Sequence, residues 1–214
     1  MKRLFCLLAT VLLFGAVAAQ ATNVLTFSGF QAPYESILGY YNGGVGGLGT
    51  GPGPNYGVVF GSEALALPNG PGSNVSDEPG GSTGSMIFLS GADIMDVAGG
   101  FTTGFSFFYA APSYPGSVSV YSGLDGTGSL LGTLNLSPNG SYCGSHIYSC
   151  WTAVGVSFSG TAQSAIFAGT ANYIAFSNVT LGSSNPGTPE PGTLVMFGSG
   201  VLGLAGVIRR KLNV

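Results

Sequence analysis

The chain has 214 residues, 12% of them aromatic and only 6% charged, and its formal net charge is −3 at pH 7. All five of its lysines and arginines lie at the two ends, at Lys2, Arg3, Arg209, Arg210 and Lys211. Because the long middle of the chain has no cation that could neutralise a phosphate, its composition excludes nucleic-acid binding and any chemistry that needs a lysine or an arginine.

The first 21 residues have the three parts of a secretory signal peptide in the usual order. Lys2 and Arg3 precede an apolar run over residues 4–17, and the segment ends in small residues up to Ala21. The run is shorter than the roughly 20 apolar residues of a membrane-spanning helix. We therefore expect export through the secretion translocon and removal of residues 1–21 by signal peptidase, rather than a permanent N-terminal anchor.

The region that follows is long enough for one domain with a hydrophobic core. It holds seven acidic residues and no basic one, so its net charge is about −7. These acids are Glu35, Glu63, Asp77, Glu78, Asp93, Asp96 and Asp125. We interpret them first as solvated side chains that keep an otherwise neutral surface soluble.

Apolar residues in this region recur with a period of two. Phe101, Thr103, Phe105, Phe107 and Tyr109 fall on one side of an extended segment. Shorter alternations of the same kind follow at residues 118–120, 154–158 and 174–176. Alternation with one apolar face is typical of half-buried antiparallel strands.

Turn signals separate these predicted strands. Glycine-rich stretches at residues 42–54 and 68–84 are expected to be long flexible loops, and Asp125-Gly126 supplies the positive φ angles of a hairpin turn. No helical pattern interrupts the series. We therefore predict an all-β fold, an antiparallel β-sandwich of jelly-roll or lectin-like topology over residues 22–182, followed by a linker over residues 183–188.

Two cysteines close together offer the first candidate for special chemistry. Cys143 and Cys150 flank a short polar loop that contains His146, the single histidine of the chain. In an exported protein such a pair is expected to form a disulfide. The alternative is a metal or nucleophile site that uses His146, but metal sites need three or four ligands and only two thiols and one imidazole are present.

Four of the acids are weak candidates for a Ca²⁺ site. Asp77 and Glu78 lie in a glycine- and proline-rich loop, and Asp93 and Asp96 lie three residues apart. Ca²⁺ takes several oxygen ligands from carboxylates and loop carbonyls. Hydrolysis of a glycoside would instead need two carboxylates about 5–9 Å apart, which the sequence cannot place. We predict neither a catalytic residue nor a cofactor.

Aromatic residues in or near the loops are candidates for stacking on sugar rings. They are Tyr34, Tyr40, Tyr41, Tyr56, Tyr114 and Trp151. A flat ring with a polar tip suits this task, but it suits equally well a residue that covers the end of a sandwich core. Both interpretations stay open at this point.

The C-terminal end has the layout of a stop-transfer segment. Pro189, Glu190 and Pro191 precede an apolar run over residues 192–208, and the basic residues 209–211 follow at once. As a helix the run spans roughly 25 Å, close to a bilayer core of about 30 Å. The prolines keep the preceding segment extended, and the cations hold the far end in the cytoplasm. We predict a transmembrane helix here.

This tail resembles the PEP-CTERM sorting signal of Gram-negative bacteria, which is also called the ice-binding protein C-terminal domain. The resemblance rests on Pro189-Glu190-Pro191, the glycine-rich apolar run and the terminal Arg209-Arg210-Lys211, and it covers residues 189–214. It implies cleavage near the prolines by an exosortase, a membrane-embedded protease. Release or transfer to the surface would follow, usually in association with exopolysaccharide and biofilm.

The sequence thus predicts an exported, C-terminally sorted surface or extracellular-matrix protein without catalytic activity, held in the exopolysaccharide layer. A transient anchor in the inner membrane would precede its surface location. The alternative is a carbohydrate-binding module with a specific glycan ligand, dependent or not on Ca²⁺. The sequence names neither the glycan nor the process.

Overall fold

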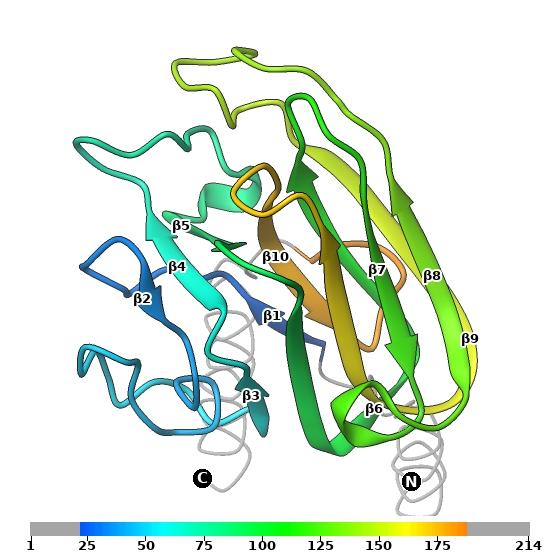
Figure 1. The fold of residues 1–214 in the computed structure, drawn as a ribbon. Coiled ribbons are helices and arrows are strands. Elements are labelled where there is room, and N and C mark those ends of the chain that lie inside the picture. Colours follow the sequence, from blue (N-terminus) through cyan, green and yellow to red (C-terminus); the bar gives the residue numbers. More distant parts are fainter. Residues whose placement is uncertain (1–21, 188–214) are drawn as a thin grey trace, which may run out of the picture.

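The computed structural model describes residues 22–187, which form β-strands joined by loops and two short 3₁₀ turns (Figure 1). The strands are β1 (Asn23–Leu25), β2 (Glu35–Ser36), β3 (Val58–Phe60), β4 (Ala64–Pro68), β5 (Gly84–Phe88), β6 (Asp93–Ala110), β7 (Gly116–Tyr121), β8 (Leu130–Leu136), β9 (Thr152–Gly169) and β10 (Ala175–Leu181). The turns are η1 (Pro79–Gly81) and η2 (Leu124–Gly126).

The predictions for the two ends of the chain lie outside these residues. They are the signal peptide, the transmembrane helix and the sorting signal from residue 189 onward. Between residues 22 and 187, no helix has the length and apolar composition to span a membrane. The domain limit at residue 182 and the linker that follows it stay predictions.

All ten strands join one antiparallel sheet, so the prediction of an all-β antiparallel fold is confirmed. Its main order is β2-β4-β5-β10-β6-β9-β7-β8, with β1 beside β10 and β3 beside β6. The long strands β6 and β9 pair along almost their whole length, and β9 also pairs with β7, which is followed by β8 at the edge of the sheet (Figure 1). The jelly-roll or lectin-like topology remains a prediction.

The two halves of β6 serve different parts of the sheet. Its second half pairs with β10, whereas its first half pairs with β3. The β6–β9 ladder shifts register between residues 96 and 101 and again between residues 102 and 104. Such irregularities bend and twist strands. The single sheet can therefore enclose a common core between its two ends, as expected of a β-sandwich.

The predicted alternation in β6 holds except at Thr103. Phe101, Phe105, Phe107 and Tyr109 are buried, but Thr103 is exposed and has a φ of 71°. Its hydroxyl donates to the carbonyls of Thr102 and Gly182. The prediction that Thr103 shares the apolar side is wrong, because a bulge interrupts the period of two at this residue.

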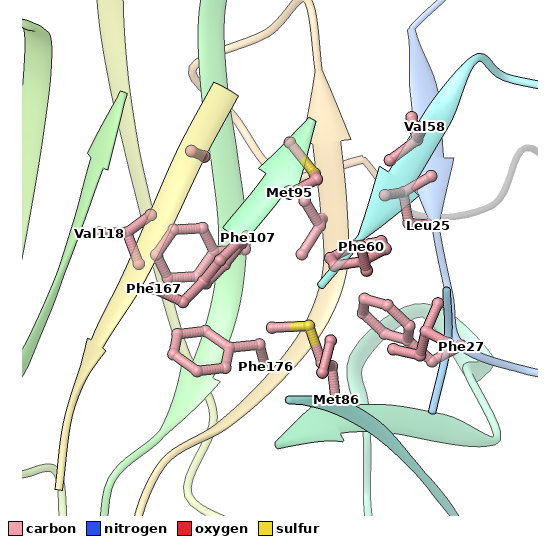
Figure 2. Packing of buried hydrophobic residues seen from close by; sticks show 14 of the residues in the cluster. Leu25, Phe27, Val58, Phe60, Met86, Met95, Phe107, Val118, Phe167 and Phe176 are labelled. Carbon is pink, nitrogen blue, oxygen red and sulfur yellow. The ribbon is translucent and has the colours of Figure 1, made fainter. Parts of the chain in front are cut away.

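Aromatic rings from three strands form the centre of the core (Figure 2). Phe107 of β6 lies 6.1 Å from Phe167 of β9 and 5.5 Å from Phe176 of β10, between ring centroids, and Phe167 and Phe176 are 5.0 Å apart. Figure 2 shows a second group around Phe27 and Phe60, with methionines between the two groups. Burial of each such ring contributes about 1.5–3 kcal/mol to stability.

A smaller apolar cluster covers the other face of β10. It consists of Leu67, Val75, Ile87, Ala110, Tyr148 and Ala175, with Trp151 partly buried against it. Val75 and Tyr148 form an isolated β-bridge between the loop after β4 and the loop before β9. These loops cover Ala175, while Asn178 donates to the Pro79 carbonyl in η1 and Thr180 accepts the Gly187 amide, both at 2.8 Å. Every residue of β10 is therefore buried, whereas alternation alone predicted a half-exposed strand.

The glycine-rich loop at residues 42–54 is folded around the carboxylate of Glu35. This side chain is 1% exposed and accepts hydrogen bonds from the amides of Leu48 and Thr50, both at 3.0 Å, and from the Thr50 hydroxyl at 2.6 Å. A side chain at Gly46 would collide with the same carboxylate. The loop predicted to be flexible therefore has a fixed set of internal hydrogen bonds.

The predicted hairpin turn between β7 and β8 is present. Asp125 and Gly126 have φ angles of 54° and 69°, and the amide of Gly123 donates to the carbonyl of Thr127 at 3.0 Å. The turn contacts β6 as well, because the amide of Asp125 donates to Oδ1 of Asp96 at 2.9 Å. Asp125, for which the sequence predicts only a local role in the turn, therefore also lies beside Asp96.

The Glu35 contacts predict a measurable loss of stability in Glu35→Gln. Burial alone would raise the pKa of Glu35, but the hydrogen bonds from Thr50 and Leu48 lower it overall. A charged acceptor makes stronger hydrogen bonds, so the variant should lose about 1–3 kcal/mol in urea unfolding near pH 7. Because the folded-state pKa is lowered, this difference is present above the ordinary glutamate pKa and shrinks as the pH falls through the folded-state value.

The matched control is Asp77→Asn, which removes one charge from an exposed carboxylate. Equal unfolding free energies for Glu35→Gln and the control would contradict the role assigned to Glu35.

Candidate functional site

A pocket of about 360 Å³ opens where the chain enters β2 and leaves β4. It is lined by parts of residues 29–34 and 67–73 and by Thr83, and we call it the tyrosine pocket after Tyr34. Its polar groups are the side-chain amides of Gln31 and Asn69 and the hydroxyls of Ser73 and Thr83. No acidic, basic or imidazole side chain is among the lining residues, so the pocket can bind a neutral molecule but offers no general acid or base other than a phenol.

Tyr34 presents its ring to solvent at this pocket. The side chain is 48% exposed, and its backbone has a φ of 62°. The Tyr34 amide donates to the carbonyl of Ala66 at 2.8 Å, which fixes the residue against β4. Positive φ is uncommon for a large side chain and is often found where a residue has a functional task.

The opposite wall of the pocket is held by short hydrogen bonds. The amide of Asn69 donates to the Thr83 carbonyl at 2.9 Å, and the amide of Ser73 donates to the Gly70 carbonyl at 3.0 Å. The side-chain amide of Asn69 donates to Oε2 of Glu78 at 2.9 Å. The polar groups of the wall are therefore held in place before any ligand arrives.

A second aromatic feature of the surface is an exposed pair of tyrosines. The rings of Tyr114 and Tyr173 are 4.5 Å apart, and both side chains are more than 40% exposed. Between them and the pocket lies the buried Tyr148, whose hydroxyl donates to the Asn172 carbonyl at 2.5 Å. Burial and the nearby phenols of Tyr173 and Tyr34 raise the pKa of Tyr148 to about 12.

Two of the predicted aromatic candidates are part of the core instead. Tyr40 and Tyr41 are buried, and the Tyr41 hydroxyl accepts the amide of Phe27 at 2.7 Å. Burial raises the pKa of Tyr41 well above the usual range for a phenol. The interpretation of these two as exposed sugar-stacking residues is wrong, because the loop of residues 42–54 and strand β3 cover them.

The other predicted aromatics are spread over the surface. Tyr56 is partly exposed and stacks on Tyr41 at 6.2 Å, whereas Trp151 is partly buried and donates its indole N–H to the Ser76 carbonyl at 2.9 Å. Of the predicted aromatic candidates, Tyr34 alone lines the tyrosine pocket. Tyr173 was not among the predicted candidates, although it directly precedes the predicted strand at residues 174–176.

Cys143 and Cys150 form a disulfide, with their Cα atoms 5.0 Å apart. The bridge closes the loop that contains His146, whose Nδ1 is buried without a hydrogen-bond partner. The carbonyl of His146 accepts the Ser149 hydroxyl at 2.7 Å. Since both sulfurs are used in the bridge, neither is a thiolate for a nucleophilic or metal site with His146.

The four predicted Ca²⁺ candidates lie in two separate places. Asp77 is exposed and accepts the Ser76 hydroxyl at 2.7 Å, and Glu78 is buried beside Asn69. Asp93 and Asp96 instead line a second pocket of about 270 Å³ with Glu63 and Asp125. We call this one the acidic pocket. Its four carboxylates come from three separate segments of the chain, so sequence spacing could not group them.

Asp93 is the most unusual group of the acidic pocket. Its side chain is 1% exposed, and neither carboxylate oxygen has a hydrogen bond of normal geometry. Burial, followed by the charges of Glu63 and Asp96, raises the pKa of Asp93 to about 7, although the nearby amides of Ile94 and Ala64 oppose the shift. A carboxyl group in this position is unstable as an unpaired anion.

Asp96 and Asp125 form the rim of the same pocket. Burial is the main cause that raises the pKa of Asp96, and the adjacent carboxylate of Asp125 adds to it, whereas the Asp125 amide lowers it. The hydroxyl of Ser90 donates to Glu63 on the other side. Carboxylates thus surround the opening, and the region between residues 4 and 208 has no lysine or arginine to pair with them.

Comparison with known families identifies the C-terminal tail. The PEP-CTERM protein-sorting motif matches residues 187–211, which confirms the resemblance seen in the sequence. The motif implies export, processing by an exosortase at the membrane and sorting to the cell surface. None of the curated proteins that were compared matches the chain.

Solved structures resemble part of the β-rich region. A carbohydrate-binding module of Cellvibrio mixtus lichenase 5A in complex with cellotriose is 14% identical, with a TM-score of 0.39 over 57% of this chain and 88% of the module. A β-1,3-glucan-binding module from Bacillus halodurans is 16% identical, with a TM-score of 0.40 over 56% of this chain and 84% of the module. The adhesin domain of Lys-gingipain from Porphyromonas gingivalis is 12% identical, with a TM-score of 0.36 over 57% and 93%. Structural similarity at these low identities and TM-scores assigns no ligand to this chain.

The environment of Asp93 predicts how stability depends on pH when a chelator is present. The folded-state pKa of about 7 lies above the ordinary value of 3.8, so the folded protein binds this proton more tightly than the unfolded chain. The contribution of Asp93 to wild-type stability should fall as the pH rises from about 4 to about 7. Asp93→Asn removes this contribution, and its stability relative to wild type should increase over that range by a few kcal/mol.

Urea unfolding of both proteins in EDTA at several pH values measures this difference. Parallel pH profiles for Asp93→Asn and wild type would show that Asp93 is not a buried, proton-binding carboxylate.

Proposed function

We propose that this exported, C-terminally sorted protein binds an uncharged glycan through the tyrosine pocket and does not cleave it. The exopolysaccharide layer around the cell is where such a protein would be retained. The observation that carries the proposal is the exposed ring of Tyr34 at a pocket whose polar groups are uncharged amides and hydroxyls.

The chemistry of the pocket suits a sugar. One face of a pyranose ring carries C–H groups that pack against an aromatic ring, while its hydroxyls both donate and accept hydrogen bonds. Tyr34 offers the ring, and Gln31 and Asn69 offer amides that can donate and accept. A pocket with an apolar surface and a few fixed polar groups is typical of small-ligand sites.

The absence of an acid among the lining residues supports binding without hydrolysis. Glycoside cleavage needs a carboxylic acid and a carboxylate on either side of the scissile bond. The tyrosine pocket has neither, and the carboxylates of Asp93 and Asp96 line the other pocket, which shares no lining residue with it. The protein would therefore hold a polysaccharide rather than degrade it.

Tyr34→Ala tests the glycan proposal. We expect the variant to bind the retained polysaccharide at least about tenfold more weakly than wild type, because truncation of a central aromatic contact removes much of the binding energy of a small interface. Affinity electrophoresis of the exported protein in gels that contain neutral or acidic polysaccharides measures the change. Neutral polymers should retard the wild type, and acidic ones should not, since the domain carries about −7.

Tyr142→Ala is the matched control, because Tyr142 is a highly exposed tyrosine that lines none of the pockets described above. Equal retardation of Tyr34→Ala and wild type would place binding elsewhere. No retardation of the wild type by any polymer would favour the other interpretation of the sequence, a surface protein with a purely structural role.

The sorting motif predicts the mass of the mature protein. We expect the exported form in its host to lack residues 1–21 and the segment beyond the cleavage site near Pro189-Glu190-Pro191. Glu190→Ala should reduce cleavage and leave a longer species in the membrane fraction. Intact-mass measurement of both proteins distinguishes the forms, and a full-length wild-type chain in the medium would refute processing.

A further inference from the structure

We propose that the acidic pocket, lined by parts of residues 59–63 and 92–96 and by Asp125, is a Ca²⁺ site in which Asp93 and Asp96 are the principal ligands. The proposal does not depend on the tyrosine pocket, which lies between other segments of the chain. It is based on the burial of Asp93, the position of its neighbours and the charge of the whole domain.

Asp93 is at the start of β6, and its carboxylate lies against the backbone of Gly61. A side chain added at Gly61 would lie 2.8 Å from Oδ1 of Asp93, so glycine leaves the room that this carboxylate occupies. Asp93 and Gly61 both line the acidic pocket, and the Gly61 amide donates to the Ile94 carbonyl at 2.8 Å. Both carboxylate oxygens are buried beside this pocket and lack a hydrogen-bond partner.

A buried carboxylate needs compensation, which other proteins commonly supply with an arginine, a lysine or several amide donors. Glu35 in this protein has such donors at hydrogen-bond distance, whereas the amides of Ile94 and Ala64 near Asp93 make no hydrogen bond of normal geometry to it. No lysine or arginine lies between residues 4 and 208 to act as a partner. A proton or a bound cation remains as the compensating charge.

The neighbouring carboxylates favour a cation over a proton. Asp96 and Asp125 line the same pocket as Asp93, and the amide of Asp125 donates to Oδ1 of Asp96 at 2.9 Å. One proton on Asp93 leaves the other carboxylates of the pocket charged and close to one another. A divalent ion compensates two of them at once, and Ca²⁺ accepts six to eight oxygen ligands in flexible geometry, including carbonyls and water.

The expected affinity is low. Within residues 22–187 no three carboxylate, imidazole or thiolate groups already converge as a complete metal site. Two carboxylates would bind the ion directly, and carbonyl oxygens and water would complete its coordination. Sites of this kind in extracellular modules have dissociation constants on the order of 10⁻⁴–10⁻³ M.

Calcium titration of the exported protein tests the proposal. Thermal unfolding is followed as CaCl₂ replaces KCl at constant ionic strength, and isothermal titration calorimetry gives the dissociation constant. The wild type should show a saturable rise in melting temperature. Asp93→Asn and Asp96→Asn should each bind Ca²⁺ at least about tenfold more weakly, because ligand charge sets the affinity of a Ca²⁺ site.

Asp77→Asn is the control, since it removes the same charge from an exposed carboxylate that does not line the acidic pocket. It should keep the wild-type affinity within about twofold. The proposal fails if Asp77→Asn weakens the response as much as Asp93→Asn does, because Ca²⁺ would then only screen the negative domain. It also fails if the wild type shows no saturable response, which would leave a proton as the partner of Asp93.

Failure of calcium binding would leave glycan binding unaffected as a hypothesis. Affinity electrophoresis reports on Tyr34 and calorimetry with CaCl₂ reports on Asp93, so the two outcomes are independent.

Discussion

The absence of positive side chains between the two ends of the chain constrains every polar interaction inside this protein. Residues 22–187 contain no lysine or arginine, so no carboxylate among them can form an ion pair with such a side chain from the same region. Each buried acid must therefore find amide or hydroxyl donors, take up a proton or bind a cation from solution. The three solutions have different consequences for stability, and the structure uses more than one of them.

Glu35 is compensated by amide and hydroxyl donors, whereas neither carboxylate oxygen of Asp93 has a hydrogen bond of normal geometry. Around Glu35 the chain wraps a glycine-rich loop so that two amides and a hydroxyl point at one carboxylate. Glu78 is intermediate, because Asn69 donates to one oxygen and the other has no partner. Without cations nearby, the Glu35 carboxylate is held by the ordered loop of residues 42–54, whereas the Asp93 carboxylate is left open to an ion.

The same distribution of charge distinguishes the body of the chain from its two ends. Cations beside apolar runs stay on the cytoplasmic side of a membrane, and the PEP-CTERM motif at residues 187–211 lies at such a run. A body without lysine or arginine has few groups that attract acidic surfaces, and its net charge keeps it soluble after export. A neutral glycan is a partner that such a surface does not repel.

The sequence by itself determined the secondary-structure class, the hairpin turn at Asp125 and the sorting motif, because these depend on the order of neighbouring residues. Periodicity of two predicts a strand wherever one face is buried and the other is exposed. It failed at Thr103, where a bulge interrupts the alternation, and in β10, where loops cover the face predicted to be exposed. Only the tertiary structure decided which tyrosines are exposed and which acids are neighbours. Tyr41 is buried while Tyr34 is exposed, and Asp125 lies beside Asp96 while Asp77 does not, because strand pairing brings together residues that are far apart in the sequence.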